Sequence, residues 1–260
     1  MSWHQKAPYY RPEASAPVFT VRAEGLAVTS PHGRSNHQLF SDFSLKLRRG
    51  EMIGLTGPSG AGKTTLGNVL LGLRRPDRGR VFWENIDIYR AHRKTIKALR
   101  PLYQKLYQDP IVSFYAAQKA GQALLDVVRY HRLASGRLSD FTMVERIVEK
   151  MGLGSEHLER FPGQLSGGEL QRLALARILL LKPRFIFADE PTSRLDLSVQ
   201  AHVIRLIAEL VDREQISVLL VSHDQELLGA ICHRIINLEL KIVTTPPATF
   251  RGYCQTRRLT

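Results

Sequence analysis

One short stretch of the chain has the residue types and spacing of a phosphate-binding loop. It matches G-x-x-x-x-G-K-[ST] at every fixed position and reads Gly57-Pro58-Ser59-Gly60-Ala61-Gly62-Lys63-Thr64. Glycines allow the unusual backbone torsions that bring several N–H groups onto one anion, and the helix expected after the loop adds its own N-terminal donors and dipole. We therefore expect the loop, together with Thr65, to bind the phosphates of a nucleotide.

Two side chains at the end of the loop have specific roles in such a site. Lys63 would reach the β- and γ-phosphates, and the Thr64 hydroxyl would ligate Mg²⁺. The alternative is a chance glycine-rich turn. However, an apolar run at Met52 to Leu55 precedes the loop, which is followed at helical spacing by Leu66, Val69, Leu70 and Leu73. This predicts the strand–loop–helix context that the motif requires and disfavours a chance turn.

A pair of carboxylates closes a second apolar run. Phe185 to Ala188 is typical of a fully buried parallel strand, and Asp189 and Glu190 follow directly. The last residues of such a strand emerge at the ligand-binding edge of the sheet. We expect Asp189 to hold Mg²⁺ through its water shell and Glu190 to orient and deprotonate an attacking water. The alternative is a pair of solvated acids at the end of the strand, which is less favoured because the same chain contains an intact phosphate loop.

The elements that must position these residues alternate along the chain. Strand-like runs are expected at residues 18–28, 52–55, 81–83, 185–188 and 217–221. Helices are expected after the phosphate loop, ending at Pro76 and Gly79, and at residues 169–181, 198–212 and 225–230. Alternating strands and helices predict a mostly parallel sheet covered by helices, with sites at the strands' carboxyl ends. Between residues 110 and 165 only helical spacing occurs, which indicates an inserted helical subdomain.

Composition limits the kinds of binding partner and the cellular compartment that the protein is expected to have. The 260 residues carry a formal net charge of +13, and the basic residues are dispersed rather than gathered in a stripe. A surplus of this kind attracts nucleic acid, anionic lipid or acidic protein, although dispersed charge is more often a solvated surface. No apolar stretch approaches the ~18 residues that cross a bilayer, so a membrane role would need another chain to supply the span. The cysteines, Cys232 and Cys254, have no metal-ligand spacing and fit a reducing compartment.

Further motifs fall between and after these two. The stretch Leu165-Ser166-Gly167-Gly168-Glu169-Leu170-Gln171-Arg172 resembles the signature of ATP-binding-cassette (ABC) ATPases, with Glu169 where the family usually has glutamine. Gln108 is similar to the family's Q-loop glutamine, His223 to its switch histidine, and Ser193 to Asp196 to its D-loop. The resemblance runs from about residue 18 to 243, and its motifs occur in the family's order.

The resemblance implies a nucleotide shared between two chains. Ser166, Gly167, Gly168 and Glu169 would contact the γ-phosphate that the opposite subunit holds, with Asp196 nearby. Gln108 would add a metal contact to those of Thr64 and Asp189. The predicted catalytic residues are Glu190, His223, Lys63 and Gln108. Three alternatives remain open: a solvated loop residue for Gln108, a satisfied strand-end histidine for His223, and a helix-starting residue for Asp196. The family usually stacks adenine on an aromatic residue, which residues 27–30 lack; either His32, His37 or Phe40 would substitute, or base stacking would be weak.

The resemblance also implies a fold and a division of the chain. We expect an α/β P-loop NTPase of the ABC type, with a mostly parallel core sheet, an N-terminal antiparallel β subdomain and the inserted helical subdomain at about residues 110–165. An irregular arm would occupy residues 1–17, the cassette residues 18–243 and a basic C-terminal tail residues 244–260.

Two stretches are similar to one branch of the family, the ATPases of peptide, nickel and metal–metallophore importers. These are Gln108-Asp109-Pro110 and Leu195 to Gln200. The branch implies a second, different ATPase chain, two integral-membrane permease subunits, an extracytoplasmic substrate-binding protein and a place on the cytoplasmic face of the inner membrane. ATP and Mg²⁺ are the expected ligands, with no specific nucleic acid. The competing function, motivated by the basic charge, is a soluble ABC-type ATPase in DNA repair, translation or cofactor assembly.

Overall fold

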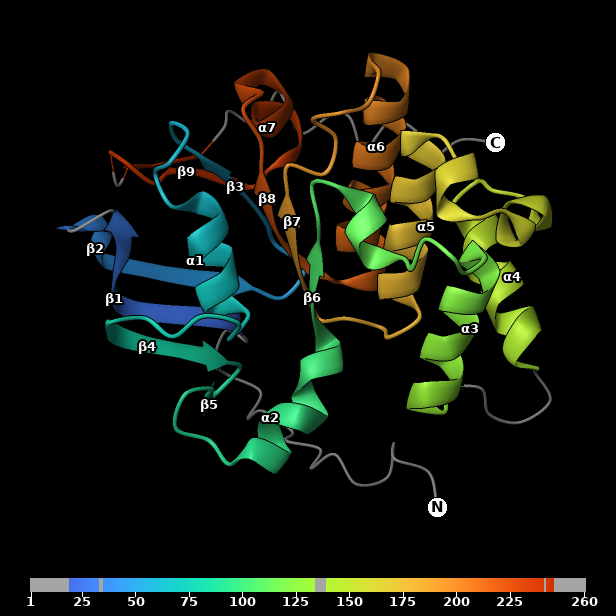
Figure 1. The fold of residues 1–260 in the computed structure, drawn as a ribbon. Coiled ribbons are helices and arrows are strands. Elements are labelled where there is room, and N and C mark those ends of the chain that lie inside the picture. Colours follow the sequence, from blue (N-terminus) through green and yellow to red (C-terminus); the bar gives the residue numbers. More distant parts are fainter. Residues whose placement is uncertain (1–18, 33–34, 134–138, 241, 246–260) are drawn as a thin grey trace.

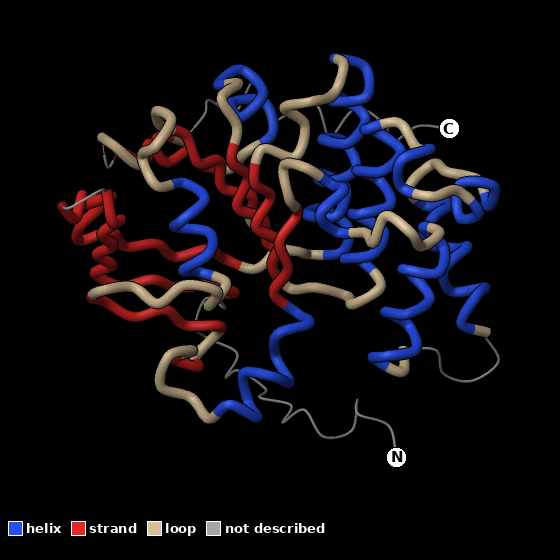
Figure 2. The backbone as a smooth tube through the Cα atoms, viewed as in Figure 1, coloured by secondary structure: helices blue, strands red, loops and turns tan. Residues whose placement is uncertain are grey.

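The structure is a computed structural model that describes residues 19–32, 35–133, 139–240 and 242–245. These residues form two sheets and the helices that pack against them (Figure 1; Figure 2). The predicted N-terminal arm and all but the first residues of the predicted tail lie outside the described residues. Within them, no helix is long and apolar enough to cross a membrane.

The first sheet is antiparallel and has the order β2-β1-β4-β5. Its strands are β1 (Phe19–His32), β2 (Ser35–Arg48), β4 (Arg78–Trp83) and β5 (Ile86–Asp87). Val21 is the register partner of both Leu47 on β2 and Trp83 on β4, and all three side chains are buried. Because side chains alternate along a strand, this row forms the inner face of the sheet.

The second sheet carries the phosphate loop and has the order β10-β9-β3-β8-β7-β6. Its strands in chain order are β3 (Met52–Thr56), β6 (Tyr103–Leu106), β7 (Phe185–Asp189), β8 (Ser217–Val221), β9 (Arg234–Asn237) and β10 (Ile242–Thr244). All neighbours pair in parallel except β10, which runs antiparallel to β9. The carboxyl ends of β3, β6, β7 and β8 therefore lie along one edge of the sheet.

The parallel sheet separates two hydrophobic cores. Phe185 and Phe187 point to the face covered by helix α1 (Lys63–Leu70) and the antiparallel sheet, whereas Ile186 and Ala188 point to the opposite face. There the sheet is covered by α5 (Gly167–Leu179), α6 (Leu197–Glu214) and α7 (Gln225–Ile231). Gly67 lets α1 approach β7 closely, because a Cβ at this position would lie 2.0 Å from the Phe187 ring.

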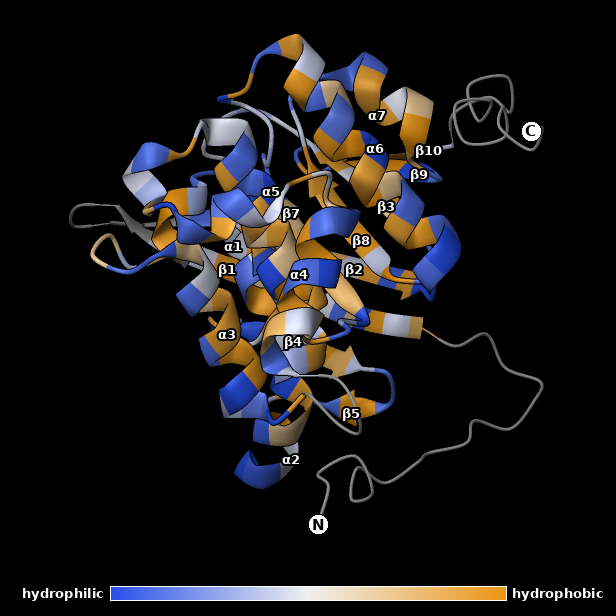
Figure 3. Cartoon of the chain, turned by 90° about the vertical axis from the view of Figure 1, so that its right-hand side faces the viewer, coloured by the Kyte–Doolittle hydropathy of each residue, from blue (hydrophilic) through white to orange (hydrophobic). Residues whose placement is uncertain are grey.

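The helical subdomain packs on α5. It contains η3 (Pro110–Ser113), α3 (Ala120–His131), α4 (Asp140–Lys150), η4 (Ser155–Glu159) and η5 (Pro162–Gln164). Val128, Val144 and Val148 are buried in the same core as α5, and hydrophobic and hydrophilic bands alternate along these helices in Figure 3. Ser139 begins α4, because its side chain accepts a hydrogen bond from the Thr142 N–H. As predicted, the described part of residues 110–165 contains helices and no strand.

Several boundaries differ from those predicted. The first helix ends at Leu70, before Leu73, Pro76 and Gly79, because Gly72 adopts a φ of 65° and ends it with a Schellman motif. Leu73 therefore lies outside the helix and is exposed. Strands β6 and β9 and helices α2 (Arg93–Leu99) and η2 (Arg100–Leu102) were not predicted. The sequence of β6, Tyr-Gln-Lys-Leu, is too polar to read as a buried strand, although Tyr103 and Leu106 are buried.

Candidate functional site

The phosphate loop joins β3 to α1 at the carboxyl edge of the sheet. Gly57, Gly60 and Gly62 have φ values of 144°, 82° and 92°, in the region that side chains disfavour. Gly62 is also the N-cap residue of α1, and it offers no side chain to the first turn of the helix. The first-turn N–H groups thus have no capping side chain, and α1 carries no acidic residue in that turn. This tip is suited to bind an anion, because no capping side chain occupies its N–H donors and no acidic residue offsets the positive end of its dipole.

The Lys63 side chain lies inside the curve of the loop. Its Nζ donates to the Gly57 carbonyl at 2.8 Å and to the Pro58 carbonyl at 2.9 Å, and the residue is buried. Pro58, Ser59 and Gly60 themselves are exposed. The structure therefore places a buried positive charge directly beneath an open loop, where a phosphate would exchange with the two carbonyl contacts.

Thr64 and Asp189 meet across the site. The Thr64 Oγ1 donates to Asp189 Oδ1 at 3.0 Å, and the other carboxylate oxygen of Asp189 lies 3.1 Å from Lys105 Nζ. A hydroxyl and a carboxylate at this spacing supply the hard oxygen ligands that Mg²⁺ takes alongside phosphate oxygens and water. Among the described residues there is no group of three or more His, Cys, Asp or Glu side chains that would hold a metal unaided. The residues present fit a metal that a nucleotide brings with it.

Glu190, His223 and Gln108 come together at the ends of β7, β8 and β6. Glu190 Oε1 lies 2.8 Å from His223 Nε2, and Gln108 Nε2 donates to Glu190 Oε2 at 3.4 Å. Glu190 has a φ of 48°, a left-handed backbone conformation that is unusual for a glutamate. Strained backbone conformations cluster at functional sites, although Glu84, outside this site, has a similar φ of 54°. Both carboxylate oxygens of Glu190 are thus oriented by side chains from neighbouring strands.

The signature residues form a separate helix tip. Ser166 caps α5 by accepting from the Glu169 N–H at 3.3 Å, while Glu169 Oε2 accepts from the Ser166 N–H at 2.8 Å. These two bonds make a capping box. The Ser166 N–H is the main cause that lowers the pKa of Glu169, and His157, whose Nε2 lies 3.2 Å from Glu169 Oε1, adds to the effect. In Figure 1, α1 and α5 lie on opposite sides of β6 and β7. Among the described residues, the side-chain hydrogen bonds of the α5 tip stay within residues 154–169 and do not reach the phosphate loop.

Comparison with known proteins identifies the family. The ABC transporter family profile matches residues 40–193, more than half of the chain. The oligopeptide transport ATP-binding protein OppF of Streptococcus mutans is 32% identical over 216 residues, which are 83% of this chain and 70% of OppF. The chain belongs to the ABC transporter family. The putative oligopeptide transport ATP-binding protein YkfD of Bacillus subtilis is 35% identical over 74% of this chain and 58% of its own length.

Solved structures support the same fold. The cassette MJ0796, in a dimeric post-hydrolysis state with ADP and Pi, superposes with a TM-score of 0.76 at 24% identity, covering 88% of this chain and 99% of its own. CbiO1 of Clostridium perfringens also gives a TM-score of 0.76, at 21% identity, and covers 90% of this chain and 91% of its own. The predicted family, fold class and enzyme class are thereby confirmed: the chain is an ABC ATPase. The separate roles of its site residues stay predictions.

Asp196 begins α6 of this cassette. Its Oδ1 accepts from the Val199 N–H at 3.0 Å and from the Ser198 hydroxyl at 2.7 Å. The Val199 N–H is the main cause that lowers the pKa of Asp196. The helix-starting role left open from the sequence is therefore present, and a contact with nucleotide stays a prediction.

Phe40 does not offer a ring to adenine in this cassette. It is buried, and its ring meets Phe43 edge-on with a centroid distance of 5.9 Å. A Cβ on Gly62 would lie 3.3 Å from the Phe40 ring, so Phe40 packs directly under the phosphate loop. The side chains of His32 and His37 lie outside those that the structure describes.

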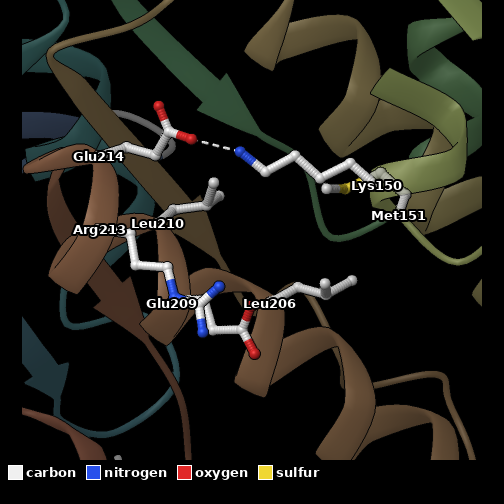
Figure 4. A pocket seen from close by; sticks show the side chains of 7 residues that line it. All are labelled: Lys150, Met151, Leu206, Glu209, Leu210, Arg213 and Glu214. Atoms are coloured by element: carbon white, nitrogen blue, oxygen red, sulfur yellow. Dashed lines mark hydrogen bonds and ion pairs between the residues drawn. The ribbon is translucent and has the colours of Figure 1, made fainter. Parts of the chain in front are cut away.

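Two further residues contact the site: Ser193, which the sequence placed in the D-loop without a role of its own, and Lys105, which it did not single out. The Ser193 hydroxyl accepts from Gln108 Nε2 at 3.1 Å and donates to the Glu190 carbonyl at 3.2 Å. Lys105 contacts Asp189 from β6. A lysine three residues before the Q-loop glutamine was visible in the sequence, but its meaning depended on a strand that the pattern did not reveal. The hollow between the end of α4 and α6 (Figure 4) is lined in part by the Lys150–Glu214 ion pair. Of the described residues that line it, none belongs to the phosphate-loop site or to the signature tip.

Proposed function

We propose that this ABC ATPase is the nucleotide-hydrolysing subunit of a peptide importer. The observation that carries the catalytic part is the convergence of Gln108, Glu190 and His223 beside the phosphate loop. The substrate class is supported by OppF and YkfD, which are named as oligopeptide transport proteins. Uptake of nickel or of metal–metallophore complexes stays a prediction of the branch resemblance.

Glu190 is the general base of the proposed reaction. Its carboxylate accepts a proton from water, the water oxygen forms a bond to the γ-phosphorus, and the bond from that phosphorus to the β,γ-bridging oxygen breaks. ADP and inorganic phosphate leave. His223 and Gln108 hold one carboxylate oxygen each, so the base is oriented before the nucleotide arrives.

Lys63, Thr64 and Asp189 bind and orient the nucleotide. Lys63 exchanges its two loop carbonyls for phosphate oxygens, which accept stronger, charge-assisted hydrogen bonds. Thr64, whose hydroxyl lies 3.0 Å from Asp189 Oδ1, would hold Mg²⁺ together with Asp189, the latter through the metal's water shell, and Gln108 is the predicted third contributor. The metal would neutralise charge that develops on the phosphates.

The signature tip completes the site of a second cassette. Ser166 and Gly167 are exposed at the start of α5, away from the chain's own phosphate loop. The hydroxyl of Ser166 and the N–H groups of Gly167 and Gly168 are the donors offered to the partner's γ-phosphate. The partner is a second ABC ATPase chain, which the branch resemblance predicts to be a different protein.

The segment after Gln108 is the docking surface for a permease subunit. Ile111, Val112 and Tyr115 are large apolar residues that are 44%, 62% and 72% exposed between β6 and α3. An apolar patch next to the catalytic glutamine transmits movement of the permease to Glu190. With a permease docked here, the subunit lies on the cytoplasmic face of the membrane. The cassette spans residues 18–243, and its helical subdomain at about residues 110–165 contacts the permease.

Co-purification and uptake test the proposal together. The tagged chain, isolated from detergent-solubilised membranes of its own organism, should bring down an integral-membrane protein and a second cassette. Cells that carry Glu190→Gln in place of the wild-type chain should lose uptake of labelled oligopeptides and keep uptake of free amino acids. Normal peptide uptake by those cells, or isolation of the chain without any membrane protein, would contradict the proposed function.

A further inference from the structure

A largely buried lysine lies next to the predicted metal-binding carboxylate. Lys105 lies on β6, and its side chain is 10% exposed. Its Nζ is 3.1 Å from Asp189 Oδ2 and donates to Asn68 Oδ1 at 3.2 Å. The ammonium also lies 5.4 Å from the ring centre of Phe187 and 5.0 Å from that of Tyr107. The side chain thus ties β6 to α1 and to the end of β7.

The environment explains why the lysine is held in one place. Removing an ammonium from water is costly unless an opposite charge and hydrogen bonds replace the water. Asp189 supplies the charge, Asn68 supplies an acceptor, and the faces of two aromatic rings surround the remainder. The carboxylate is equally constrained, because Thr64 donates to its other oxygen.

The charge balance of the site follows from this arrangement. ATP brings several negative charges to a loop that lies close to the carboxylate of Asp189. Lys63 would face the phosphates from inside the loop, and Lys105 contacts the Asp189 oxygen that Thr64 does not. Without Lys105, only Lys63 and Mg²⁺ would offset the repulsion between the Asp189 carboxylate and the phosphates, since like charges at short range in a partly buried site repel strongly.

We propose that Lys105 is a positioning residue that holds the Asp189 carboxylate and offsets its charge, so that ATP binding depends less on Mg²⁺ than it otherwise would. The inference rests on the proposed function in one respect, the assignment of Thr64 and Asp189 to the metal. Lys105 fixes Oδ2 and leaves Oδ1 directed at Thr64, where the metal is expected. Its charge is already present when the nucleotide arrives.

The test compares ATP affinity with and without the metal. Dissociation constants of a fluorescent ATP analogue are measured in excess Mg²⁺ and in excess EDTA, and their ratio is taken for each variant. Lys105→Met keeps most of the side-chain length and removes the charge, so the EDTA-to-Mg²⁺ ratio should rise about tenfold above that of the wild type, the loss expected for one charged hydrogen bond. By linkage, Mg²⁺ should bind the ATP-loaded variant more tightly by the same factor.

Matched variants separate charge from structure. Lys105→Arg should keep a ratio close to that of the wild type, and Lys150→Met, which removes a half-exposed lysine paired with Glu214, should leave it unchanged. If Lys105→Met does not fold, Lys105→Gln, which keeps a hydrogen-bond donor, should show the same rise. An unchanged or lower ratio in the neutral variant, or an equal rise in Lys150→Met, overturns the inference. A wild-type chain that binds no ATP in either condition contradicts the proposed function instead.

Discussion

The two anion-binding helix tips of the chain are built in opposite ways. The α1 tip is capped by Gly62 and has neither a capping side chain nor an acidic residue in its first turn. The α5 tip is capped by Ser166, and Glu169 brings a carboxylate into its first turn. At α1 a buried lysine stands beside the tip, whereas at α5 the neighbouring charged group is the glutamate, held by His157.

The difference in capping and charge indicates which of the two helix tips can bind a phosphate without contacts from another chain. The open α1 tip has unpaired donors, a favourable dipole and the Lys63 charge, so it holds an anion without help. The α5 tip uses the Ser166 and Glu169 N–H groups within its own capping box and already has a negative charge nearby. It therefore suits a second contact to a phosphate that another chain has already bound.

The largest expected effect comes from the catalytic glutamate beside the open tip. Glu190→Gln keeps the length of the side chain and its contact with Gln108 but cannot accept a proton. Turnover should fall about 1,000-fold, the size typical of losing a general base, while ATP affinity stays within about twofold. Single-turnover hydrolysis and equilibrium binding measure the two quantities. Wild-type turnover would refute the assignment of Glu190 as the base.

Removal of the buried lysine should affect binding itself. Lys63→Ala deletes the cation that the structure places beneath the loop, so ATP affinity should fall about 100-fold, as expected for the loss of charge-assisted hydrogen bonds to phosphate. Lys150→Ala, at a half-exposed ion pair, is the matched control and should bind ATP normally. Equal affinity of Lys63→Ala and the wild type would remove the main contrast between the two tips.

The smallest expected effect concerns the capping glutamate. Hydrogen bonding to Ser166 lowers the Glu169 pKa below 4.5, so the charged form stabilises the fold above pH 4.5, and this contribution is lost as pH falls through the folded-state pKa. Glu169→Gln can keep the capping box and has no such pH dependence. At pH 7 it should be less stable by about 0.5 kcal/mol, with the difference vanishing in acid. Urea unfolding at several pH values measures this, and a constant difference would contradict the capping account.

Much of the fold and site followed from local patterns, and the exceptions share a cause. The phosphate loop, the Asp189–Glu190 pair and the signature are contiguous motifs, so their spacing alone predicted the elements around them. Gln108, Glu190 and His223 meet only because β6, β7 and β8 are neighbours in the sheet. Their order along the chain resembled a known family, but the contacts between them required the strand order.

Lys105 and Leu73 illustrate what local patterns do not contain. Lys105 sits in a short strand whose polar residues hide its periodicity, and its partner Asp189 is distant in the sequence. Leu73 had the right spacing for the α1 face, but the left-handed conformation of Gly72 ended the helix first. In the first case the tertiary partner decides the role of a residue, and in the second a backbone conformation overrides hydrophobic spacing.

The composite site is tested most directly by labelling each chain of the cassette pair. The complex is purified with its partner cassette, or with a differently tagged second copy, and each chain is labelled with a photoreactive ATP analogue. Ser166→Arg alters only the α5 tip. Labelling of the partner's phosphate loop should therefore fall at least about tenfold, as expected for losing one hydrogen bond to a charged phosphate, while labelling of the mutated chain persists. Loss confined to the mutated chain's own loop would contradict a nucleotide shared between two chains.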